Sequence, residues 1–81
     1  MESRIALVGI IVENNDSVEE LNRILSAYGQ YIIGRMGVPY REKNISIISV
    51  AMDAPSDIIS ALSGKLGMLS GVSTKTVYAK K

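Results

Sequence analysis

The amino-acid sequence predicts an α+β protein with a ferredoxin-like βαββαβ fold, in which two helices cover one face of a four-stranded antiparallel sheet. Two stretches of the chain repeat apolar residues at helical spacing, and four short runs rich in β-branched residues flank them in the required order. Right-handed crossovers then place the first and third strands in the middle of the sheet. Because 81 residues is the length of one domain, residues 1–81 are expected to form a single domain.

The first strand and helix are predicted from adjacent segments of the chain. The run from Arg4 to Glu13 is short and rich in Ile and Val, which is typical of a strand. Ser17 and Glu20 match a capping box, in which each side chain satisfies a backbone amide at the start of a helix. The helix is expected over residues 17–28, with Gly29 ending it in the left-handed conformation. Its apolar residues are Val18, Leu21, Ile24, Leu25 and Tyr28.

The second strand is predicted from Tyr31 to Tyr40, and its composition indicates where it lies. It contains Gly34, Gly37 and Pro39, and such residues in a strand point to an edge position or a bulge. The polar residues 41–44 then have the length of a hairpin turn.

The second half of the chain repeats the order strand, helix, strand. Residues 45–52 form the third strand, and Asp53 to Asp57 open the second helix with Pro55 in the first turn. A final strand spans Val72 to Ala79. The apolar stripe of the second helix is Ile58, Ile59, Leu62, Leu66 and Leu69.

Both faces of the two central strands are apolar, although water should cover one face of the sheet in a monomer. One face of these strands would carry Ile5, Leu7, Ile11, Ile45, Ile47 and Ala51, and the other Ala6, Val8, Ile10, Val12, Ile48, Val50 and Met52. An exposed apolar patch of this kind marks an interface or a ligand groove. We therefore expect self-association into a homodimer or homotetramer. The alternative is that small residues dilute this face enough for a monomer to tolerate it.

Composition excludes several classes of function. The chain has no His and no Cys, so disulfides, imidazole metal sites and Ser-His-Asp or Cys-His catalysis are excluded. A net charge of +1 gives no basic face for nucleic acid, and the central strands lack the aromatic residues on which RNA-recognition domains stack bases. No apolar run reaches the roughly 20 residues of a spanning helix, and none resembles a signal peptide. We expect a cytoplasmic, non-enzymatic protein without a metal or cofactor.

A few polar residues are candidate ligand contacts. Asn14, Asn15 and Asp16 lie just before the first helix, whose N-terminus could receive an anion. Arg35 lies on a strand among small residues, where a partner could approach closely. Lys65 is a weaker candidate, because its surroundings match neither a phosphate-binding loop nor the loop of KH domains. The alternative roles are turn formation and capping, an interface ion pair, and a solvated charge.

Two glycines flank Lys65 in the second helix. Gly64 and Gly67 are interpreted as sites where this helix approaches the sheet or the other helix closely, which would offset the cost of about 1 kcal/mol for an interior helical glycine.

Two segments of the chain, Gly34 to Glu42 and Ala61 to Gly67, together with Ser70-Gly71-Val72, resemble a family of proposed iron-only hydrogenase system regulators. The resemblance covers essentially the whole chain. It implies an ACT-like ferredoxin fold, oligomerisation and a role in hydrogenase expression or maturation.

That family is similar in fold to the C-terminal domain of the nickel-responsive repressor. The repressor binds nickel through His and Cys, which this chain lacks, so the same nickel site is not expected. Only residues 1–3 precede the first strand, so direct DNA binding through a preceding segment is not expected either.

Two functions follow from these observations. The first is a homo-oligomeric regulatory domain that senses a small ligand, either at a subunit interface or near residues 14–16. The second is a structural module that binds another protein and has no small ligand.

Overall fold

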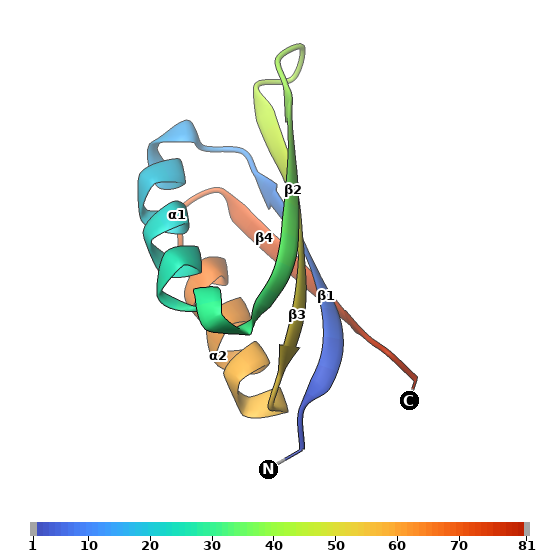
Figure 1. Ribbon diagram of the computed structural model, residues 1–81. Helices are drawn as coiled ribbons and strands as arrows, with labels where there is room; N and C mark the ends of the chain where they lie inside the picture. Colours follow the sequence, from blue (N-terminus) through green and yellow to red (C-terminus); the bar gives the residue numbers. More distant parts are fainter. Residues whose placement is uncertain (1, 81) are drawn as a thin grey trace.

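Two α-helices cover one face of a four-stranded antiparallel sheet in the computed structural model, which describes residues 2–80 (Figure 1). The sheet order is β2-β3-β1-β4, with β1 and β3 in the middle. The ferredoxin-like βαββαβ prediction is therefore confirmed. The elements are β1 (Arg4–Val12), α1 (Val18–Ala27), β2 (Ile32–Tyr40), β3 (Ile45–Ala54), α2 (Ser56–Gly67) and β4 (Val72–Tyr78), with 3-10 turns at Asn15–Ser17 and Gly29–Tyr31.

The hydrophobic core lies between the helices and the sheet. Side chains alternate between the two faces of a strand, and in β1 it is the even-numbered residues that point toward the helices. The matching residues of β3 and the inner stripes of both helices complete the core. Its fully buried large side chains are Ile10, Leu21, Leu25, Met52, Ile59, Leu62, Leu66, Val8, Val12 and Val50. Neither α1 nor α2, the α-helices of residues 2–80, is long and apolar enough to cross a membrane.

The start of α1 differs from the predicted capping box. The hydroxyl of Ser17 makes no bond to the helix and instead donates to the carbonyl of Ser70, at 2.7 Å. Glu20 does not reach back to the helix start but pairs with Arg23 at 2.6 Å. The capping-box prediction is wrong because Ser17 has a partner 53 residues away that no local pattern reveals.

Gly71, rather than Gly29, adopts the left-handed conformation. Its φ is +72°, whereas Gly29 begins a 3-10 turn after α1. The backbone amide of Glu13 donates to the carbonyl of Gly71 at 2.7 Å, and Asn14 packs against the space where a side chain would stand. We call this junction of the β1–α1 and α2–β4 connections the loop latch; it consists of Glu13, Asn14, Ser17, Ser70 and Gly71.

The predicted edge position of the second strand is confirmed. β2 pairs only with β3, and its register shifts between Ile32 and Gly34, which is a bulge. Residues 41–44 form the turn of the hairpin, which projects past the helices, and Asn44 has a φ of +57° (Figure 1). The interpretation of Gly64 and Gly67 is wrong, because a Cβ at either position would meet no atom within 4 Å. Both glycines face open space.

Candidate functional site

The face of the sheet opposite the helices, which we call the open face, carries exposed apolar side chains from all four strands. Their exposed fractions run from 38% for Ile11 to 67% for Met36, values far above those of the core. Strand register assigns these residues to one face, because each pairs with or lies beside another of them. They are Ile5, Leu7 and Ile11 of β1, Met36, Val38 and Tyr40 of β2, Ile47 of β3 and Val77 of β4.

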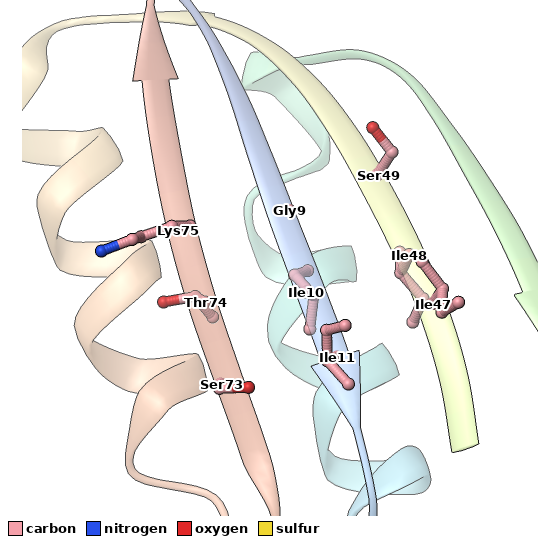
Figure 2. A pocket seen from close by; sticks show the side chains of 9 residues that line it. All are labelled: Gly9, Ile10, Ile11, Ile47, Ile48, Ser49, Ser73, Thr74 and Lys75. Carbon is pink, nitrogen blue, oxygen red and sulfur yellow. The ribbon is translucent and has the colours of Figure 1, made fainter. Parts of the chain in front are cut away.

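A hollow of about 570 Å³ lies at the centre of the open face (Figure 2). It exists because Gly9 has no side chain and its neighbour across the β1–β3 pairing, Ser49, has a small one. Ile11 and Ile47 form its apolar side, and Ser73 of β4 also lines it. Backbone atoms of the central strands therefore form the floor of the hollow.

The chemistry of the hollow is apolar, with hydroxyl groups at its margins. Ser49 and Ser73 supply the hydroxyls, since the Thr74 hydroxyl lies 3.0 Å from that of Ser63 in α2. Among the described residues that line the hollow, Lys75 alone is charged. Figure 2 shows the Lys75 side chain extending away from β1, so its amine does not lie over the centre of the hollow. The hollow thus suits apolar side chains or an apolar ligand, and it holds no acid–base pair.

Residues 14–16, which are predicted to contact a ligand, make hydrogen bonds within and between loops of the chain. The Asn14 amide donates to the Ser70 hydroxyl at 3.1 Å, and its oxygen accepts from the Asp16 backbone amide at 3.0 Å. Asn15 donates to Asn44 in the β2–β3 hairpin at 3.2 Å. Hydrogen bonds within the chain therefore engage the side chains of Asn14 and Asn15, whereas Asp16 takes part through its backbone amide.

Arg35 contacts α1, and Lys65 contacts Tyr28, the residue that follows α1. Arg35 lies on the helix side of β2, where its guanidinium donates to Asn22 at 3.1 Å. The Lys65 amine lies 5.3 Å from the centre of the Tyr28 ring, a cation–π distance. The structure thus places the predicted residues 14–16, Arg35 and Lys65 against different partners, and none of them lines the hollow. Their roles in ligand binding stay predictions.

The hollow at Gly9 is absent from the sites expected from sequence. The sequence signal for this hollow is Gly9 itself, because a glycine within an apolar strand often marks a close approach of another backbone or of a ligand. Its significance depends on Ser49 lying beside it, which only the register of β1 and β3 reveals. Within residues 2–80, no three Asp or Glu side chains gather so as to hold a metal ion.

One tyrosine at the end of the open face has a shifted pKa. The Tyr40 hydroxyl donates to Glu42 at 2.7 Å, and this hydrogen bond, with a smaller effect of desolvation, raises the pKa of Tyr40 above its ordinary 10.0. The folded state holds this proton more tightly than the unfolded state does. Its contribution to stability is therefore complete below pH 10.0 and is lost as pH rises through the raised pKa.

Glu42→Gln should bring the pKa of Tyr40 back toward 10.0, because the variant removes the carboxylate acceptor. An NMR titration that follows the Tyr40 ring would measure the change. Glu19→Gln, on the exposed start of α1, is the control and should leave this titration unmoved. An equal pKa in the Glu42→Gln variant and the native protein would contradict the assignment.

The fold and the open face define a small ferredoxin-like domain whose unusual feature is an apolar surface rather than a cluster of reactive groups. A family model matches residues 4–76. The chain belongs to the TM1266-like family, described as "Iron-only hydrogenase system regulator, putative". This confirms the family resemblance found in the sequence.

One solved structure is similar to this chain in both sequence and fold. The uncharacterized protein TM1266 from Thermotoga maritima is 39% identical, with a TM-score of 0.94 over 98% of this chain and 100% of that one. No curated protein sequence matches the chain.

Two further structures share the fold at low identity. A formyltetrahydrofolate deformylase from Pseudomonas putida KT2440 is 11% identical with a TM-score of 0.68, and the match spans 95% of this chain but 29% of the enzyme. CPII, a nitrogen regulatory PII-like protein from Thiomonas intermedia K12 bound to ADP, AMP and bicarbonate, is 15% identical with a TM-score of 0.54 over 98% and 99% of the chains. At these identities the likeness extends to the fold alone.

Proposed function

We propose that this protein is a non-catalytic regulatory domain of an iron-only hydrogenase system, and that it works in the cytoplasm as a homo-oligomer. Membership of the family supports the link to hydrogenase regulation. The observation that carries the homo-oligomer is the open face, where eight large apolar side chains remain 38–67% exposed. Burying such a surface against another protein is favourable by roughly 25 cal/mol per Å² of apolar area.

Ligand sensing is the finer part of this proposal. A small ligand would bind at a subunit interface or near residues 14–16. The hollow supports the first location, since it offers apolar walls and two hydroxyl groups on the face that we propose to be shared. At residues 14–16, a ligand would have to compete with the hydrogen bonds to Ser70 and Asn44.

A structural module that binds another protein is the second candidate. The exposed edge of β2 favours it, because an unpaired strand edge can accept a strand from a partner. The same is true of the open face, which could pack against a different protein in place of a second copy.

Native mass spectrometry of the purified protein tests both candidates. We expect a dimer or a tetramer. Extra mass on the oligomer would support ligand sensing and give the mass of the ligand, whereas an oligomer without extra mass would favour the structural module. A monomer at micromolar concentration would contradict the proposed homo-oligomer.

A further inference from the structure

We infer that two copies of this chain pack face to face through their open faces, with a twofold axis that runs along the strands between β1 and β3. This inference rests on the proposed homo-oligomer and specifies its interface. In such a dimer, β1 of each copy lies over β3 of the other, and β4 lies over β2. A twofold axis along the strands permits no sliding in that direction, so residues at the same level of the sheet must meet.

The side chains of the open face form three central rows across the sheet. The middle row is Met36, Ser49, Gly9 and Lys75. The row on one side is Gly34, Ala51, Leu7 and Val77, and the row on the other is Val38, Ile47, Ile11 and Ser73. Small residues occupy the centre of the middle row, the β2–β3 half of one outer row and the β4 end of the other.

This uneven distribution makes much of the open face complementary to itself. The proposed axis sets Leu7 over Ala51 of the second copy, Val77 over Gly34, and Val38 over Ser73, as the three rows require. Each of these pairs joins a large side chain to a small one, which is how interdigitated cores reach native packing density.

The hollow accommodates the pair of opposed isoleucines. Ile11 would meet Ile47 of the second copy, directly beside the place where Gly9 meets Ser49. The hollow is lined by these same residues and so provides the space into which the two isoleucines can lean. Without it, two opposed isoleucines would hold the sheets apart.

Charge decides between the two directions of the twofold axis that keep the strands of the two sheets aligned. An axis across the strands over Gly9 would also pair large with small residues, but it would set Lys75 against Lys75 of the second copy. Opposed like charges are destabilising. The axis along the strands sets Lys75 over Met36, where the methylene groups of the lysine can pack and its amine can reach solvent beyond β4 (Figure 2).

The area of the open face approaches what each partner buries in a stable dimer. Four strands about 4.8 Å apart and about seven residues long span a plane of roughly 19 by 24 Å. Protruding side chains make the accessible area larger than that plane and bring it toward the roughly 800 Å² that each partner buries in a stable complex.

Analytical ultracentrifugation of Leu7→Arg would test the interface. Leu7 is 48% exposed, so a charge there should be tolerated in a monomer but should weaken a face-to-face dimer by about 100-fold or more. Met68→Arg is the matched control, because Met68 is an apolar residue with 86% exposure that lies outside the open face. Circular dichroism would establish that both variants fold.

The outcomes separate the interface from the oligomer itself. A dimeric native protein with a monomeric Leu7→Arg and a dimeric Met68→Arg would support the inference. A native oligomer that Leu7→Arg leaves intact would overturn the face-to-face interface and leave the homo-oligomer standing. A monomeric native protein would overturn the homo-oligomer and the interface together.

Single-cysteine variants provide a test that does not depend on weakening the dimer, because the chain contains no cysteine. Ser49→Cys should be protected from a bulky maleimide in the dimer, whereas Ser26→Cys on the exposed side of α1 should react at once. Equal reaction at both positions would overturn the interface.

Spin labels at Lys43→Cys would then report the direction of the axis. An axis along the strands places both hairpins at one end of the dimer, with labelled positions roughly 15 Å apart for a strand spacing of about 4.8 Å and a sheet spacing of about 10 Å. A separation near or above the 41 Å length of the molecule would place the hairpins at opposite ends and overturn the proposed axis.

Discussion

Gly71→Ala should lower the free energy of unfolding by about 2–5 kcal/mol, the sum of the cost of a left-handed alanine and the cost of overpacking. Gly71 has a φ of +72°, a conformation that side chains disfavour. A Cβ at this position would lie 2.6 Å from Cβ of Asn14 and 2.9 Å from its backbone nitrogen. The backbone of the loop latch would have to move, and the hydrogen bond from Glu13 to Gly71 would be strained.

Gly64→Ala is the control for this experiment. Gly64 lies inside α2, where a Cβ would meet no atom within 4 Å, so alanine should stabilise the protein by roughly 0.5–1 kcal/mol. Urea denaturation followed by circular dichroism would measure both variants. Opposite signs are expected, and a Gly71→Ala variant as stable as the native protein would contradict the described geometry of the latch.

Ile10→Ala should cost about 2–5 kcal/mol, the range for removing a buried isoleucine and leaving a cavity. Ile10 is 1% exposed and packs under the helices, whereas its neighbour Ile11 is 38% exposed on the open face. Ile11→Ala makes the same chemical change in the same strand. In a dilute, monomeric sample it should cost roughly 1 kcal/mol, because less apolar surface is lost from the core.

The stability costs of Ile10→Ala and Ile11→Ala should depend differently on protein concentration. If the open face forms the dimer, the cost of Ile11→Ala should increase with protein concentration, since association stabilises the native state by mass action. The cost of Ile10→Ala should change much less. Urea titrations at two protein concentrations would show the difference, and equal costs for the two variants in the dilute sample would contradict the division into a core face and an open face.

The fold could be predicted because its determinants are short-range. The alternation in β1 separates residues such as Ile10 from residues such as Ile11 without any knowledge of the rest of the chain. The glycines and the proline of β2 likewise indicate an edge strand with a bulge, and the structure shows both. Handedness of the crossovers then leaves one arrangement of the sheet.

The capping-box and helix-end predictions are wrong because they use local patterns alone. Ser17 and Glu20 have the spacing of a capping box, yet the Ser17 hydroxyl bonds to Ser70 across the loop latch. Gly29 follows a helix, which favours a left-handed residue, but the chain continues there into the 3-10 turn Gly29–Tyr31, and the left-handed glycine is Gly71. No spacing along the chain contains this information.

The candidate site was harder to predict than the fold. Polar loop residues such as Asn14 are predicted ligand contacts because their functional groups can be identified in the sequence. In the structure, Asn14 is hydrogen-bonded within the chain. The hollow results from a missing side chain at Gly9 and a small one at Ser49, which lie 40 positions apart and become neighbours only through strand pairing. The apolar open face itself was predictable, because it follows from alternation.

The central position of β1 has a consequence for biosynthesis. β1 is made first among the strands, yet one of its two neighbours in the sheet is β4, which is made after every other element. Until residues 72–78 leave the ribosome, a nascent chain has an unpaired edge on β1 and an incomplete cover over its apolar residues. Such edges invite pairing with other chains. We therefore expect an incomplete chain to associate with other chains more readily than the finished domain does.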